Sequence, residues 1–200
     1  MITLLLIRHA TTDAVGKHLS GRAPGVLLNK EGQNQAQNLA QRLSGLPIKA
    51  IYSSPLERAF QTAEPLAQLF QLTTQINEDF IELNFGDWTN AAFTDLQNDV
   101  HFKRFNSFRS VTRIPGGELM LEAQIRMVNG LQKLCSQHPN HTVAVVSHSD
   151  LIKATIAYYA GIPLDLFQRL EISPASVSVI QIFEETARIL LVNSTSEIPT

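Results

Sequence analysis

The sequence predicts an α/β fold in which helices cover both faces of a largely parallel sheet, a three-layer α/β/α sandwich. Two apolar runs, residues 3–7 and 142–146, are short and bounded by polar residues, as expected for strands buried inside a parallel sheet. Segments with apolar residues at helical spacing lie between the runs, and this alternation is typical of the class. The sheet could carry one antiparallel strand at its edge.

The first strand, residues 3–7, precedes a helix over residues 31–43 whose apolar side chains recur at helical spacing. These side chains are Ala36, Leu39, Ala40 and Leu43. A second strand is expected at residues 50–52, directly ahead of another helix. We expect both helices to pack on the sheet.

The second helix carries its own start signals. Ser54 and Glu57 have the spacing of a capping box, and Pro55 suits the first helical position. Pro65 should kink or shorten this helix.

A third helix is expected after Glu118, with one apolar face that should be buried. That face would consist of Leu121, Ile125, Val128, Leu131 and Cys135. Asp150 can cap a fourth helix, which Gly161 would end. Two late strands are expected around residues 176–183 and 188–193.

Composition predicts one domain over residues 1–200. A length of 200 residues and a net charge of -2 are typical of a soluble globular domain with a sizeable core. The sequence has no excess of basic residues that would indicate nucleic acid as a partner. No apolar segment is long enough to span a membrane. A single cysteine excludes an internal disulfide. Because the chain shows no basic leader, we expect a cytoplasmic protein, either a monomer or a homodimer.

Candidate functional residues lie where strands end. Arg8 and His9 follow the first strand, and His148 follows the strand at residues 142–146. In open α/β sheets the ligand crevice lies beyond the carboxyl ends of the strands, so these side chains should meet. Arg58 would lie in the first turn of its helix, where free backbone N–H groups already attract anions. This combination favours a phosphate as the ligand.

The sequence resembles the histidine phosphatase superfamily of phosphoglycerate-mutase-like proteins, through motifs that follow the family's order across most of the chain. These motifs are Arg8-His9, Leu28-Asn29-Lys30-Glu31-Gly32, Ser54-Pro55-Leu56 with Arg58, Gln61-Thr62-Ala63, Glu82, Phe85-Gly86-Asp87-Trp88, Pro115-Gly116-Gly117-Glu118 and Ser147-His148. The resemblance implies a phosphoglycerate-mutase-like fold and catalysis through a phosphohistidine, with no metal and no other cofactor.

Phosphoryl transfer needs positioning and compensation of charge on the phosphoryl oxygens. Arg8, Arg58 and His148 could provide that charge, which leaves His9 as the nucleophile because a neutral imidazole nitrogen is available near neutral pH. The resemblance assigns protonation of the leaving group to Glu82, whose pKa a nearby phosphate would raise.

The sequence departs from the family pattern at three positions around the histidines. Ala10 and Ser149 replace glycines, and Val15 stands where an asparagine is common. The Ser149 hydroxyl could bind the phosphate. By resemblance, Ser20 and Gly21 would also contact the substrate.

Residues 85–115 interrupt the regular alternation with a mixture of aromatic and basic residues. One interpretation is a small aromatic cluster under a solvated basic face. The other is a lid-like insertion that covers the crevice and selects the non-phosphate end of the substrate.

The expected function is hydrolysis of a small phosphorylated metabolite, a phosphomonoester, in the phosphatase branch of the family. One alternative is a phosphoglycerate-type phosphomutase, in which Arg104, Arg109 and Arg113 would hold a carboxylate. Another is a non-catalytic relative that binds a phosphorylated ligand. A metal hydrolase lacks the ligand spacing of its class, and a serine hydrolase lacks the GxSxG elbow.

Overall fold

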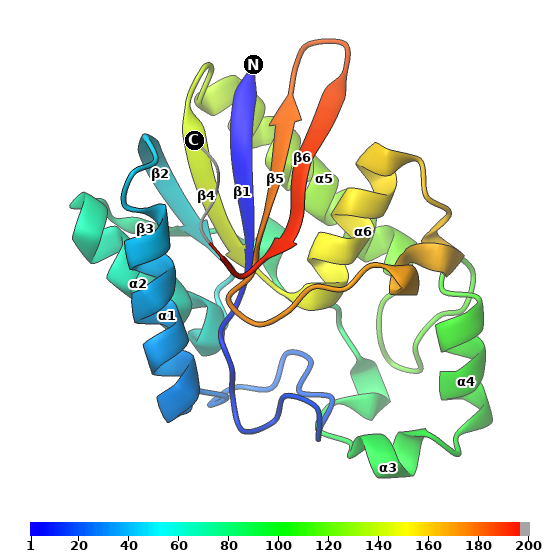
Figure 1. The fold of residues 1–200 in the computed structure, drawn as a ribbon. Coiled ribbons are helices and arrows are strands. Elements are labelled where there is room, and N and C mark those ends of the chain that lie inside the picture. The colour runs from blue at the N-terminus through cyan, green and yellow to red at the C-terminus, as the bar shows by residue number, and fades with distance from the viewer. Residues whose placement is uncertain (197–200) are drawn as a thin grey trace.

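The computed structural model describes residues 1–196 and shows a six-stranded sheet with helices on both faces (Figure 1). The strand order is β3-β2-β4-β1-β5-β6. The strands are β1 (Ile2–Arg8), β2 (Ile48–Ser53), β3 (Thr74–Ile76), β4 (Thr142–Ser147), β5 (Val177–Ile182) and β6 (Ala187–Ser194). The first four strands in sequence pair in parallel, whereas β5 is antiparallel to both β1 and β6. The predicted fold class is therefore confirmed. The antiparallel strand, however, is β5 inside the sheet, because a hairpin adds β6 as the outer strand.

The structure contains the helices α1 (Lys30–Leu43), α2 (Glu57–Phe70), α3 (Phe93–Leu96), α4 (Val100–Ser107), α5 (Met120–Gln137) and α6 (Ser149–Ala160). Helices α1 and α2 cover one face of the sheet, and helices α5 and α6 cover the other. Side chains alternate along β1, so that Leu5 and Ile7 join the apolar core with α1 and α2, while Leu4 and Leu6 join the core with α5 and α6. Burial on both faces explains why the strands appear in sequence as continuous apolar runs.

Helix α2 begins later than predicted. Its first residue is Glu57, and Leu56 precedes it without a side-chain cap. The Ser54 hydroxyl instead accepts a hydrogen bond from the Leu56 N–H, so the predicted capping box is wrong. Pro65 lies inside the helix, which continues to Phe70 and is not shortened.

The buried face of α5 agrees only in part with the prediction, because Val128 and Leu131 are buried as expected but other members are not. Leu121 and Ile125 are 42% and 51% exposed, whereas Met120 and Met127 are fully buried. The helix presents the neighbouring stripe to the core, which leaves Cys135 only partly buried. Apolar residues at helical spacing occur on two adjacent stripes of this helix, which differ by a rotation of about 100°, one residue. The spacing alone therefore does not decide which stripe faces the core.

At α6 the prediction is correct for the end and wrong for the start. Gly161 ends the helix in the left-handed conformation, as expected. His148 is the N-cap, and Asp150 lies within the first turn rather than capping it.

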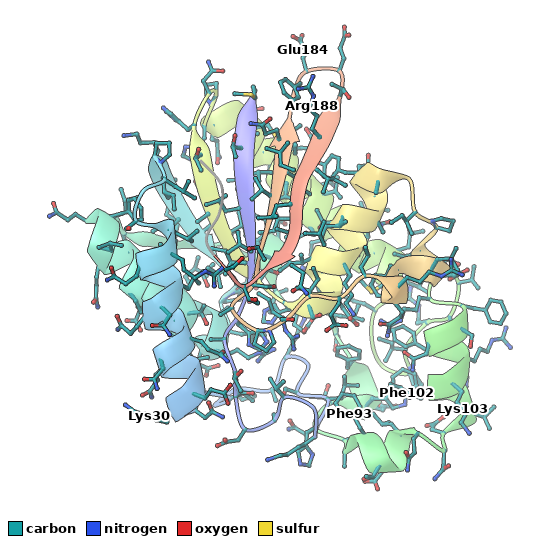
Figure 2. The ribbon with its side chains drawn as sticks, viewed as in Figure 1. Lys30, Phe93, Phe102, Lys103, Glu184 and Arg188 are labelled. Carbon is teal, nitrogen blue, oxygen red and sulfur yellow. The ribbon has the colours of Figure 1, made fainter. Side chains whose placement is uncertain are left out.

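The segment over residues 85–115 forms α3, α4 and the 3-10 helix η2 (Gly86–Trp88), beyond the carboxyl ends of the parallel strands (Figure 1). The rings of Trp88 and Phe105 are buried with centroids 5.5 Å apart, and Trp88 also stacks edge-on with Phe102 at 5.2 Å. Figure 2 shows Phe93 and Phe102 in this region below the sheet. An aromatic cluster is therefore present. Arg109 is only 4% exposed, so it is not part of a solvated basic face.

No helix within the described residues is long and apolar enough to cross a membrane.

Candidate active site

The parallel pairing of β1 and β4 brings the two predicted histidines together. Arg8 is in register with Ser147, and the His9 N–H donates a hydrogen bond to the Ser147 carbonyl at 2.9 Å. The imidazole rings of His9 and His148 consequently lie with centroids 5.3 Å apart, and both side chains are buried.

Hydrogen bonds on both ring nitrogens fix the tautomer of His9. Its Nδ1 is 2.8 Å from the Ala10 carbonyl oxygen, which can only accept, so Nδ1 carries the proton. Its Nε2 lies 3.3 Å from Arg58 Nε, which can only donate, so Nε2 holds the lone pair. Burial, together with the charges of Arg58 and Arg8, lowers the pKa of His9 well below its ordinary value. The site therefore holds His9 neutral with a nucleophilic nitrogen.

His148 is oriented in a similar way. Arg58 Nη2 donates to its Nδ1 at 3.3 Å, and its Nε2 donates to the Ser54 hydroxyl at 2.8 Å. Burial and the nearby charge of Arg58 lower the pKa of His148. The serine that fails to cap α2 thus positions the second histidine.

Arg58 links the site together from the first turn of α2. Besides the two imidazoles, it donates to the Gly21 carbonyl at 2.8 Å. Its Nη1 and the Nε of Arg8 form no hydrogen bond with any residue among 1–196. The buried guanidinium group of Arg58 and the partly buried one of Arg8, with free N–H donors next to a neutral imidazole, can bind an anion. Thr62, one turn further along α2, accepts from the Ala10 N–H and so holds the backbone after His9.

Glu82 has the properties of a proton donor. Its Oε2 lies 3.7 Å from His148 Nδ1, and its side chain is largely buried. Desolvation, followed by the charge of Asp150, raises the pKa of Glu82 to about 7, against the opposing effects of Arg58, the Leu83 N–H and Arg8. A carboxyl group with this pKa can donate and accept a proton near neutral pH.

These groups surround a cavity of about 220 Å³. Of the residues predicted from the sequence, the lining includes Arg8, His9, Ser20, Gly21, Arg58, Glu82 and Ser149. His148 lies behind the lining, in contact with Arg58 and Ser54.

Sequence reasoning missed several lining residues. Asp150, which is expected to cap α6, lines the cavity and pairs with Arg109 at 2.7 Å. Its position two residues after His148 was the available signal. Gly16 and His18 also line the cavity, and no motif in the sequence marks them. Within the described residues, no three His, Cys, Asp or Glu side chains are grouped so as to hold a metal ion.

The arrangement combines what transfer of a phosphoryl group requires. It contains a neutral imidazole lone pair, fixed positive charge and a carboxyl group that titrates near neutral pH. Such groups can act as a nucleophile, as stabilisation for the equatorial oxygens and as an acid for the leaving group.

Comparison with known proteins gives one consistent family. Phosphoserine phosphatase 1 of Hydrogenobacter thermophilus is 32% identical over 200 residues, covering 98% of this chain and 93% of that protein. A 2,3-bisphosphoglycerate-dependent phosphoglycerate mutase of Thermoplasma acidophilum is 28% identical over 196 residues, covering 96% of this chain and 92% of that protein.

Solved structures agree with this fold. The crystal structure of a mutant phosphoserine phosphatase from Entamoeba histolytica in complex with phosphoserine matches with a TM-score of 0.89 at 27% identity, over 100% of both chains. The sequence model of the protein family described as histidine phosphatase superfamily (branch 1) matches residues 4–195 of this chain. With the histidine pair, the two arginines beside it and the whole-length matches in agreement, this chain belongs to the histidine phosphatase superfamily.

Proposed function

We propose that this protein hydrolyses a small phosphomonoester through a phosphohistidine on His9. The observation that carries the proposal is the lone pair of His9 Nε2, held 3.3 Å from Arg58 Nε at the wall of a cavity that Arg8 also lines. Nε2 attacks phosphorus, the N–P bond forms and the ester P–O bond breaks, while Glu82 gives its proton to the leaving alkoxide. Water then attacks phosphorus, returns a proton to Glu82, and releases phosphate and free His9.

Arg8, Arg58 and His148 act on the transferred phosphoryl group. The free N–H donors of Arg8 and Arg58 can bond the equatorial oxygens, where charge is spread in the transition state. His148 can add a further donor once it gains a proton, which an anionic phosphoryl group next to it favours. Ser20, Gly21 and Ser149 line the same cavity and are proposed to bind the phosphate or its ester oxygen.

Hydrolysis fits the geometry better than mutase chemistry. A mutase would need cations for the carboxylate of a sugar acid, for which Arg104, Arg109 and Arg113 were the candidates. Arg109 is instead buried and paired with Asp150, while Arg113 pairs with Glu122 at the surface.

The space for the leaving group is bounded by aromatic side chains. A second cavity of about 340 Å³ shares Leu19, Phe85, Phe93 and Asp150 with the first. This continuity supports residues 85–115 as the part of the chain that selects the alcohol, so the lid interpretation and the aromatic cluster are compatible. The proposed partner is a small phosphorylated metabolite. A cytoplasmic location and a monomeric or homodimeric state stay predictions.

The first test is phosphate release from phosphoserine and p-nitrophenyl phosphate in excess EDTA. We expect full activity with the chelator, because the proposed mechanism uses only side chains, and inhibition by vanadate, which imitates five-coordinate phosphorus. Activity that disappears with EDTA and returns with a divalent ion would instead indicate a metal-dependent hydrolase. A purified, folded protein that releases no phosphate from any phosphoester would favour the non-catalytic alternative.

A second test separates hydrolysis from isomerisation. Incubation with 3-phosphoglycerate should release inorganic phosphate, slowly or not at all, without accumulation of the 2-isomer. NMR of phosphorus can follow both products in one sample, with and without a 2,3-bisphosphoglycerate primer. Rapid primer-dependent isomerisation would reverse the assignment to the phosphatase branch.

A further inference from the structure

The backbone that carries Glu82 has little regular structure of its own. Residues 78–84 contain only the short 3-10 helix η1 (Glu78–Phe80), after which the chain runs without a helix or strand through Glu82. The Glu82 carboxyl group is therefore not positioned by the hydrogen bonds of a helix or a sheet. The backbone N–H and C=O groups of this segment must find other partners.

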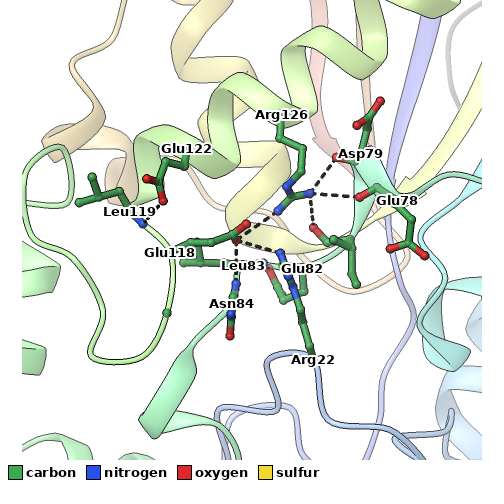
Figure 3. Close-up of polar contacts among 12 residues, drawn as sticks. Arg22, Glu78, Asp79, Glu82, Leu83, Asn84, Glu118, Leu119, Glu122 and Arg126 are labelled. Atoms are coloured by element: carbon green, nitrogen blue, oxygen red, sulfur yellow. Dashed lines mark hydrogen bonds and ion pairs between the residues drawn. The ribbon is translucent and has the colours of Figure 1, made fainter.

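Three charged side chains supply those partners (Figure 3). Arg126, on α5, donates from Nη1 to the carbonyls of Asp79 and Ile81, each at 2.9 Å. Arg22 donates from Nε to the carbonyl of Glu82 itself at 2.7 Å. Both guanidinium groups thus hold the carbonyls on either side of the Glu82 Cα.

Glu118 joins the two arginines. One of its carboxylate oxygens, Oε2, is 2.9 Å from Arg22 Nη2 and 3.3 Å from Arg126 Nη2. The same oxygen accepts from the Asn84 N–H at 2.9 Å. The side chains are mostly covered, with exposed fractions of 30% for Arg22, 20% for Glu118 and 19% for Arg126.

The turn before Glu118 is itself fixed against the same backbone. A Cβ atom on Gly117 would come within 2.3 Å of the Asn84 carbonyl oxygen, so only glycine permits this approach. The Glu118 N–H donates to the same carbonyl at 3.0 Å. The Pro-Gly-Gly-Glu motif found in the sequence therefore delivers a carboxylate to this position.

Arg22 also connects this network to the phosphate site. It follows Gly21, whose carbonyl accepts from Arg58 at 2.8 Å. The loop that contains Gly21 and Arg22 is thus hydrogen-bonded both to Arg58, which contacts the two histidines, and to the backbone of Glu82.

We infer that Arg22, Glu118 and Arg126 are positioning residues that hold the Glu82 carboxyl group at the leaving oxygen. The inference rests on the proposed hydrolysis and on the role of Glu82 in it. Proton transfer to the leaving group needs hydrogen-bond distance, and a displacement of about 1 Å can reduce a rate ~100-fold. Breaking the network should therefore affect catalysis by Glu82 and leave attack by His9 intact.

The experiment compares two substrates with different needs for the acid. Glu118→Gln and Arg22→Met should lower kcat on phosphoserine by roughly 10-fold to 100-fold, because its alkoxide must be protonated. On p-nitrophenyl phosphate, whose leaving group needs little help, kcat should stay within about 3-fold. Arg188→Met is the control: it removes an arginine at the opposite end of the sheet (Figure 2), next to Phe183, and should leave both rates within ~2-fold.

A double variant makes the test specific for Glu82. In a Glu82→Gln background, adding Glu118→Gln should cause no further loss on phosphoserine, since the group being positioned is already absent. Equal losses on both substrates, an additive further loss in the double variant, or no loss at all would overturn the inference. Arg22→Met gives the same readout if Glu118→Gln fails to fold. If the wild-type protein hydrolyses neither substrate, the proposed function fails and this inference fails with it.

Discussion

His9→Ala should reduce phosphoryl transfer by roughly four orders of magnitude or more, as loss of a covalent nucleophile does in other enzymes. The substitution removes the imidazole whose Nε2 lone pair is fixed at the cavity wall by Arg58 and the Ala10 carbonyl. Steady-state hydrolysis of p-nitrophenyl phosphate measures this loss. Rapid quenching with radiolabelled substrate should give a protein-bound phosphate that is labile in acid and stable in base in the wild type only.

An exposed histidine that lines neither cavity supplies the control. His101 lies on α4 and is exposed, so His101→Ala should keep both the activity and the labelled intermediate. Retention of acid-labile label in His9→Ala would falsify the assignment of the nucleophile. Transfer of the label to His148 is the specific alternative, because its ring is the neighbouring imidazole.

Glu82→Gln should produce the second large effect, a loss of about 100-fold to 10,000-fold on phosphoserine, the range that general acid catalysis contributes. The glutamine keeps the shape of the side chain and cannot supply the proton. On p-nitrophenyl phosphate the loss should be much smaller. Equal losses on both substrates would mean that Glu82 only shapes the cavity.

The pH dependence follows from the raised pKa of Glu82, about 7. The proton donor is the protonated form, so kcat/KM on phosphoserine, which reports the groups of the free enzyme, should fall as the pH rises above 7. Below that pH the acid is protonated and this loss is absent. The Glu82→Gln profile should lack this alkaline fall, which a stopped assay from pH 5 to pH 9 can establish.

Much of the fold was accessible from the sequence because the strands are buried on both faces. Continuous apolar runs identified β1 and β4, and the general rule for parallel sheets placed His9 and His148 at a common edge. The resemblance then added Glu82, whose segment has no periodic pattern to reveal it.

The rest depended on contacts that local patterns do not contain. Ser54 has the spacing of a capping residue, but tertiary contact with His148 and the Leu56 N–H determines its role. Asp150 was similar, since its partner Arg109 lies 41 positions away. Local rules predict what a side chain can do, and long-range packing selects among those possibilities.

Arg58 ties the site to the course of folding. Its hydrogen bonds span 37 positions to Gly21, 49 to His9 and 90 to His148. Closing such long loops costs conformational entropy before any contact compensates for it, so these bonds form only when β1, β2 and β4 are already ordered side by side. A partly folded chain would contain every chemical group of the site and still be inactive. Catalytic activity is therefore restricted to the native topology, and its recovery marks the completion of folding.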